Sequence, residues 1–117
     1  MTLRRMKTYA GGQGYVYQYY FVGRRAAPND SAVTEYIFDV SSDRKTIFAV
    51  TVSLPAKIVQ QWSANHDRSL TEAEQYAAVK MRLMRAFDEI ENMLADGRQL
   101  TVDVESLEQL LTTLGVD

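Results

Sequence analysis

The stretch TEYIFDVSSDRKTIFAVTVS, residues 34–53, decides the fold that the sequence predicts. Apolar side chains alternate with their neighbours along both arms, Thr34–Ser41 and Lys45–Ser53, as they do in strands that bury one face. Ser42-Asp43-Arg44 lies between the arms and is typical of a tight turn. We therefore expect a β-hairpin with a clear core face.

A further strand is predicted at Tyr15–Val22, where four of the chain's seven tyrosines fall within six residues. The odd-numbered residues of this run are all aromatic and share one face, while the even-numbered residues share the other. Because Tyr20 adds an aromatic ring to the second face, the pattern leaves open which face is buried. The segment Gly23–Ala32 is rich in turn-forming residues and is expected to be a mobile surface loop.

Two consecutive helices are predicted after the hairpin. The first is expected to run from Pro55, which suits the first turn of a helix, to about Asn65. The second begins at a capping box, for which residues 69 and 72 or residues 71 and 74 are equally suited. Its apolar stripe recurs at three- and four-residue steps as far as Leu94, and Gly97 is expected to end the helix in a left-handed conformation.

The order of these elements predicts a single α+β domain spanning residues 1–117. An antiparallel three-stranded sheet, N-terminal in the chain, is expected to pack against the two consecutive helices plus a short C-terminal helix. Residues 1–13 are expected to form a flexible basic arm. Residues 98–117 are expected to hold an extended segment and a helix capped by Asp103.

The chain contains no cysteine, which excludes a disulfide scaffold, a thiolate zinc site and a cysteine nucleophile. No cofactor and no metal site is expected. No run of about 18 apolar residues is present, so we expect no membrane segment. A soluble cytoplasmic protein is therefore predicted.

Charge is distributed unevenly along the chain, although the net charge is only −2. Residues 1–30 carry five basic side chains and one acid, whereas the segment from residue 86 onward carries eight acids and one base. Such polarity favours head-to-tail self-association, or an anionic partner at the basic end. The alternative is that the two ends neutralise each other within the fold.

His66 beside Asp67 is the only catalytic candidate with a partner in sequence, because an acid can orient a histidine base. No serine-centred nucleophile motif accompanies this pair. The acids of residues 72–74 and 88–91 suit a helix start and a polar helix flank. We expect a non-enzymatic protein, and a hydrolase or ligand-binding enzyme built on His66 is the alternative.

The candidate interaction surface combines the tyrosine strand, the arginines that follow it and a leucine stripe near the C-terminus. Its members are Tyr15, Tyr17, Tyr19, Arg24, Arg25, Leu107, Leu110, Leu111 and Leu114. Tyrosine and arginine are enriched at protein interfaces, and a leucine stripe has to be buried against something. We expect a small interaction module that self-associates as a homodimer or binds another protein.

A single-stranded nucleic-acid-binding domain is the alternative function. Tyrosine rings on an open sheet can stack on unpaired bases, while Arg24 and Arg25 hold phosphates. The isoelectric point of about 5.4 disfavours strong non-specific binding, because affinity for phosphate backbones grows with the number of charges neutralised.

Overall fold

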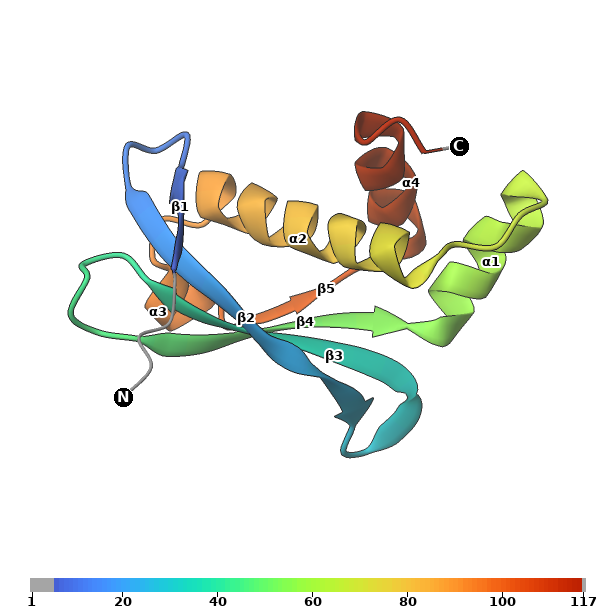
Figure 1. The fold of residues 1–117 in the computed structure, drawn as a ribbon, viewed down its shortest axis with the longest axis horizontal. Coiled ribbons are helices and arrows are strands. Elements are labelled where there is room, and N and C mark those ends of the chain that lie inside the picture. Colours follow the sequence, from blue (N-terminus) through green and yellow to red (C-terminus); the bar gives the residue numbers. More distant parts are fainter. Residues whose placement is uncertain (1–5, 117) are drawn as a thin grey trace.

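The computed structural model describes residues 6–116, which form an α+β fold with helices covering one face of a sheet (Figure 1). The strands are β1 (Lys7–Ala10), β2 (Val16–Ala27), β3 (Asp30–Ser41), β4 (Phe48–Pro55) and β5 (Gln99–Thr101). The helices are α1 (Ala56–His66), α2 (Glu72–Glu89), α3 (Met93–Asp96) and α4 (Val104–Thr113). The predicted α+β class is therefore confirmed.

The sheet is larger than the antiparallel three-stranded sheet that the sequence predicts. The described residues form a mixed sheet of five strands in the order β1-β2-β3-β4-β5. Neighbours are antiparallel from β1 to β4, whereas β5 lies parallel to β4 and pairs Leu100 with Val52. Strand β1 escaped prediction because it is short and shows no clear hydrophobic alternation, whereas β5 lies within the extended segment expected in residues 98–117 and only its pairing with the sheet was missed.

Strand β1 occupies part of the segment expected to be a flexible basic arm. Lys7–Ala10 pairs with the start of β2, and the Tyr9 hydroxyl donates to both Asp88 carboxylate oxygens at 3.0 and 2.9 Å. The glycines that follow also lie against the end of α2. A Cβ at Gly11 would approach the Phe87 carbonyl oxygen to 3.0 Å, and the Gly12 amide donates to Asp88 at 2.8 Å.

The predicted loop at Gly23–Ala32 is instead the tip of a long hairpin. Its first residues continue β2, and its last residues begin β3. The register between the two strands shifts between Phe21 and Gly23, which marks a β-bulge at Val22. A bulge reverses the alternation of faces, so the residues beyond it point opposite to the directions that the sequence pattern implies.

The core lies between the sheet and the helices, and the expected core face of the hairpin is confirmed. Tyr36, Phe38 and Val40 of β3 are at most 1% exposed. In β2 the odd-numbered face is the buried one, and the ring of Tyr17 stacks on Phe87 of α2 at 4.2 Å between centroids and an interplanar angle of 6°. Phe87, fully buried, also lies close to Tyr9 and Tyr19.

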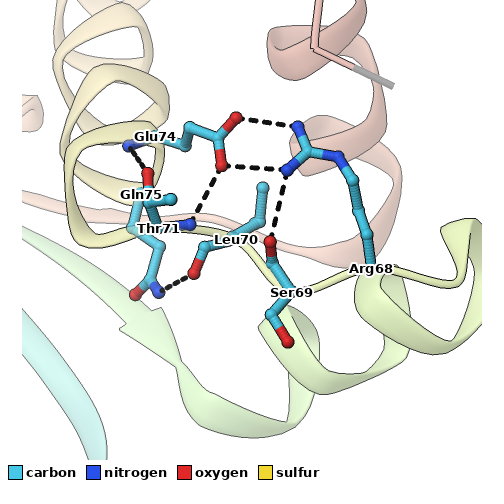
Figure 2. A network of polar contacts seen from close by, with 6 residues as sticks. All are labelled: Arg68, Ser69, Leu70, Thr71, Glu74 and Gln75. Atoms are coloured by element: carbon cyan, nitrogen blue, oxygen red, sulfur yellow. Dashed lines mark hydrogen bonds and ion pairs between the residues drawn. The ribbon is translucent and has the colours of Figure 1, made fainter.

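A polar network fixes the connection between α1 and α2 (Figure 2). Thr71 and Glu74 form the capping box, in which the Glu74 amide donates to Thr71 Oγ1 at 3.1 Å and the Thr71 amide donates to Glu74 Oε1 at 2.9 Å. The Arg68 guanidinium binds both carboxylate oxygens of Glu74, at 3.1 and 2.7 Å. These bonds lower the pKa of Glu74 from its ordinary value of 4.5 to about 2, chiefly through Arg68.

This pKa shift predicts an acid-dependent contribution to stability. Because the pKa of Glu74 is depressed in the folded state, its contribution is present above about pH 4.5 and is lost as the pH falls towards 2. We expect Glu74→Gln to destabilise the protein at about pH 6, and the gap from wild type to shrink on acidification to about pH 2.5. Urea denaturation of both proteins at the two pH values measures the gap, and a gap independent of pH contradicts the assignment.

Helix α2 is shorter than predicted. It ends at Glu89 rather than near Gly97, and Ile90 takes an extended conformation with φ −99° and ψ 114°. Asn92 then caps the separate short helix α3 by accepting a hydrogen bond from the Ala95 amide. Gly97 is not left-handed, at φ −116°, and its lack of a side chain is explained by close packing, because a Cβ there would collide with Met93 Sδ.

The C-terminal segment follows the prediction in outline. After β5, Asp103 caps α4 and its carboxylate accepts from the Ser106 amide at 2.8 Å. Among the described residues, no helix combines the length and the apolar character needed to cross a membrane.

Candidate functional site

The tyrosines of the candidate surface are divided between the core and the exterior. Tyr17 and Tyr19 are 1% and 6% exposed and pack under α2, where burial raises the pKa of both phenols. Tyr15 precedes β2 and is 44% exposed. Only one of the three rings is thus available to a partner without unfolding.

The two arginines of the candidate surface follow each other in β2 and so alternate between the two faces of the sheet, and the bulge at Val22 decides that Arg24 takes the helix side. Arg24 pairs in register with Tyr36, whose side chain is on the helix side, and binds Glu72 Oε1 at 2.8 Å. Arg25 pairs with Glu35 and binds its carboxylate at 3.0 Å. Both arginines nevertheless line one hollow beside the first turn of α2, which none of the three tyrosines lines, so the tyrosines and arginines do not form one patch.

The leucine stripe is largely part of the core. Leu107, Leu110 and Leu111 are fully buried where α4 packs against α1 and α2. Leu114 lies at the end of α4 and is 38% exposed. The stripe is buried within its own chain, so only Leu114 is left for an external contact.

The catalytic candidate His66 links two helices. Its Nε2 lies 2.7 Å from Glu108 Oε1 of α4, and its ring stacks on the buried Trp62 at 4.2 Å. Asp67 ends α1 in a left-handed conformation with φ 52°. His66 thus joins α1 to α4, and Asp67 ends α1. No group of three or more histidine or acidic side chains suited to a metal ion occurs within residues 6–116.

A groove that the sequence does not reveal lies at the end of the molecule where α3 meets the sheet. Its volume is about 490 Å³, and the residues lining it include Tyr15, Ser42, Glu91, Met93, Leu94 and Asp96. Tyr15 and Leu94 are 44% and 49% exposed, so two of the large exposed apolar side chains line the same hollow. We call this site the acidic groove, because Glu91 and Asp96 are the charged residues that line it.

Next to the acidic groove is a loop of opposite charge, residues 43–47, which we call the basic loop. It follows Ser42, joins β3 to β4 and lies at the same end of the molecule as α3 (Figure 1). It carries Arg44 and Lys45, and its last residue, Ile47, is 62% exposed. The loop therefore offers two positive charges, against the one negative charge of Asp43, beside an apolar side chain.

Asp43 gives the basic loop a fixed shape. Its carboxylate accepts from the backbone amides of Lys45 and Thr46 at 2.8 and 2.7 Å. These two bonds, Thr46 first, lower the pKa of Asp43, and Arg44 adopts a left-handed conformation with φ 65°. Because the carboxylate engages these amides, β4 begins at Phe48 rather than at Lys45 as predicted. The loop is thus pre-organised to present its side chains.

The charges of the groove and the loop are not neutralised within the described part of the chain. Arg44, Lys45, Glu91 and Asp96 form no ion pair with any residue from 6 to 116. The end of α2 nearest the groove adds to the negative charge, because its last turn holds acids and no base to offset the helix dipole. This arrangement leaves adjacent surfaces of opposite sign exposed.

The groove residues gave no combined signal in the sequence. Leu94 continues the apolar stripe that predicts a long helix, and it becomes exposed only because α2 ends before it. Tyr15 and Ser42 come from two connections far from α3 in sequence. The uneven distribution of charge along the chain was the one hint of two oppositely charged surfaces. That hint was incomplete, because Arg44 and Lys45 of the basic loop lie in the middle of the chain rather than at its basic N-terminal end.

Comparisons with known proteins give no family for this chain: no protein-family model matches it, and no curated protein or solved structure matches it.

Proposed function

We propose that the protein is a small non-enzymatic interaction module that self-associates as a symmetric dimer through the acidic groove and the basic loop. One observation carries the proposal: a groove with exposed apolar side chains and two acids lies beside a pre-organised loop with two bases and an exposed Ile47, and within residues 6–116 none of these four charges is paired. The acids of the groove can face the bases of the loop, and the exposed apolar side chains of the two surfaces can pack against each other.

The adjacency of the two surfaces supports a second copy as the partner. In a two-fold symmetric contact, a residue of one copy that meets a second residue of its partner is matched by the reciprocal pair. Because Ser42 lines the groove and directly precedes the basic loop, the two surfaces are neighbours, and a two-fold axis beside them would place each loop over the other copy's groove. Ile47 would then contact Tyr15 and Leu94, while Arg44 and Lys45 face Glu91 and Asp96.

The expected division of energy follows from the chemistry. Burial of Ile47 and Leu94, 62% and 49% exposed in the single chain, supplies affinity because apolar area leaves water. The charged rim supplies specificity and a faster approach, so the affinity should fall as salt rises. The loop loses little conformational entropy on binding, because Asp43 already holds its backbone.

Sedimentation equilibrium tests the proposal. We expect wild type to dimerise in the micromolar range and Leu94→Asp to weaken the dimer by about tenfold or more, since an unpaired carboxylate then enters an acidic apolar contact. Leu114→Asp is the matched control, because the same change at an exposed leucine of α4 should leave the association unchanged. A wild-type monomer at high micromolar concentration contradicts self-association, and equal effects of both variants contradict the groove as its site.

A further inference from the structure

A second hollow, separate from the acidic groove, lies between the β2–β3 hairpin and the first turn of α2. Its volume is about 420 Å³, and its lining includes Arg24, Thr34, Tyr36, Glu72 and Gln75. This size is within the range of small-molecule sites. The bulge at Val22 turns Arg24 towards this hollow, and the capping box at Thr71 fixes the turn that carries Glu72 and Gln75.

The hydroxyl of Tyr36 has an unmet hydrogen-bonding requirement. The residue is 1% exposed, and among the described residues no group lies in good hydrogen-bonding geometry to its buried hydroxyl. Buried polar groups are almost always paired, so such a group calls for an explanation. The Arg24 guanidinium is its neighbour, and the pKa of Arg24 is raised first by the hydrogen bond to Glu72 and then by a weaker contact in which the Tyr36 oxygen is the acceptor, which leaves the Tyr36 O–H without an acceptor. Two hydrogen-bond donors, the Arg24 guanidinium and the Tyr36 hydroxyl, thus lie close together, and the Glu72 carboxylate binds the first of them.

Glu72 holds Arg24 only loosely. The two side chains are 44% and 78% exposed, so the ion pair is of the solvent-screened kind that contributes little to stability. An incoming oxyanion could replace the Glu72 carboxylate on Arg24 and also accept from the Tyr36 hydroxyl. The dipole of α2, an 18-residue helix, favours negative charge at this end.

We propose that this hollow binds a small molecule bearing an oxyanion, a carboxylate or a phosphate group. Arg24 and the Tyr36 hydroxyl hold its oxygens, and the Gln75 amide and Thr34 hydroxyl line the remainder of the site. Glu72 acts as an internal competitor that swings into solvent when the ligand binds. The site is separate from the acidic groove, shares no lining residue with it and does not depend on self-association.

Nuclear magnetic resonance titrations with sodium succinate and, separately, sodium phosphate test the site, at an ionic strength held constant with sodium chloride. We expect saturable shifts of the Thr34 and Gln75 amides with at least one of the two anions, and the anion that saturates identifies the group preferred. Tyr36→Phe and Arg24→Gln should weaken binding by about tenfold or more, whereas Glu72→Gln should strengthen it.

Arg85→Gln is the matched control, since this arginine of α2 does not line the hollow, donates to Gln109 and should leave binding unchanged. Tyr36→Phe keeps the buried ring and removes only the hydroxyl, so the variant should stay folded, which its amide spectrum verifies. Non-saturating shifts with both anions overturn the proposal. Unchanged affinity in Tyr36→Phe, or weaker binding in Glu72→Gln, overturns it as well.

Discussion

Phe87→Ala is expected to lower the free energy of unfolding by about 3–5 kcal/mol, the range found when a large aromatic side chain is removed from a core. Phe87 is fully buried, and its ring stacks on Tyr17 at 4.2 Å and lies 5.8 Å from Tyr9 and 6.2 Å from Tyr19. One side chain of α2 therefore joins β1 and β2 to the helical layer. Its loss leaves a cavity at a place where three elements meet.

Urea denaturation followed by circular dichroism measures this effect. Phe87→Leu is a useful companion, because it keeps much of the apolar volume while removing the aromatic stack and should cost clearly less than the alanine variant. A loss below about 1 kcal/mol for Phe87→Ala would mean that α2 does not pack on the tyrosine strand as described.

Leu110→Ala is expected to cost about 2–5 kcal/mol of stability, whereas Leu114→Ala should cost less than about 1 kcal/mol. Leu110 lies on the buried face of α4 and is fully buried, whereas Leu114 lies at the C-terminal end of α4 and is 38% exposed. The pair separates two interpretations of the leucine stripe. A stripe buried in its own chain predicts this large difference in unfolding free energy, measured in urea at low protein concentration.

Similar small losses for both leucine variants would contradict burial within the chain. A stripe that served only self-association would instead show its effect in the sedimentation profile, with little change in the stability of the single chain. The control for both is the amount of folded protein judged by circular dichroism at the start of each titration.

The core face of the hairpin could be predicted because the sequence pattern of its first arm, residues 34–41, is enough to identify it. Tyr36, Phe38 and Val40 share one face of their strand, and the opposite face is largely polar. No tertiary contact is therefore needed to decide which face is buried. The start of α2 is similar, since the capping box is a local pattern and Thr71 with Glu74 proved to be the pair that forms it. Local signals of this kind survive in the folded chain.

The orientation of the tyrosine strand could not be predicted, because it depends on what lies across the sheet. Aromatic residues occur on both faces of the run, and Phe87, about 70 residues later, selects the face of Tyr17. The bulge at Val22 is equally hidden, since it is defined by pairing with β3. That single extra residue decides that Arg24, rather than Arg25, takes the helix side of the sheet.

The acidic groove is a product of tertiary structure alone. Its lining comes from the start of β2, the end of β3 and the segment around α3, which no spacing in the sequence brings together. Leu94 appeared to belong to a buried stripe, and only the extended conformation of Ile90 takes it out of that stripe. A periodic pattern indicates a helix, but it does not show where tertiary contacts end it.

Exchange of charge between two copies tests the proposed dimer most directly. One variant carries Arg44→Glu and Lys45→Glu, so its loop is acidic, and the other carries Glu91→Lys and Asp96→Lys, so its groove is basic. Each variant alone should sediment as a monomer, because both contacts of its homodimer join like charges. In the mixed dimer, both contacts join opposite charges again.

Sedimentation of the equimolar mixture is therefore the decisive measurement. The proposal predicts that the mixture forms dimers at concentrations where each variant alone is monomeric. A mixture that sediments as the sum of two monomers, or variants that each dimerise as wild type does, would contradict it.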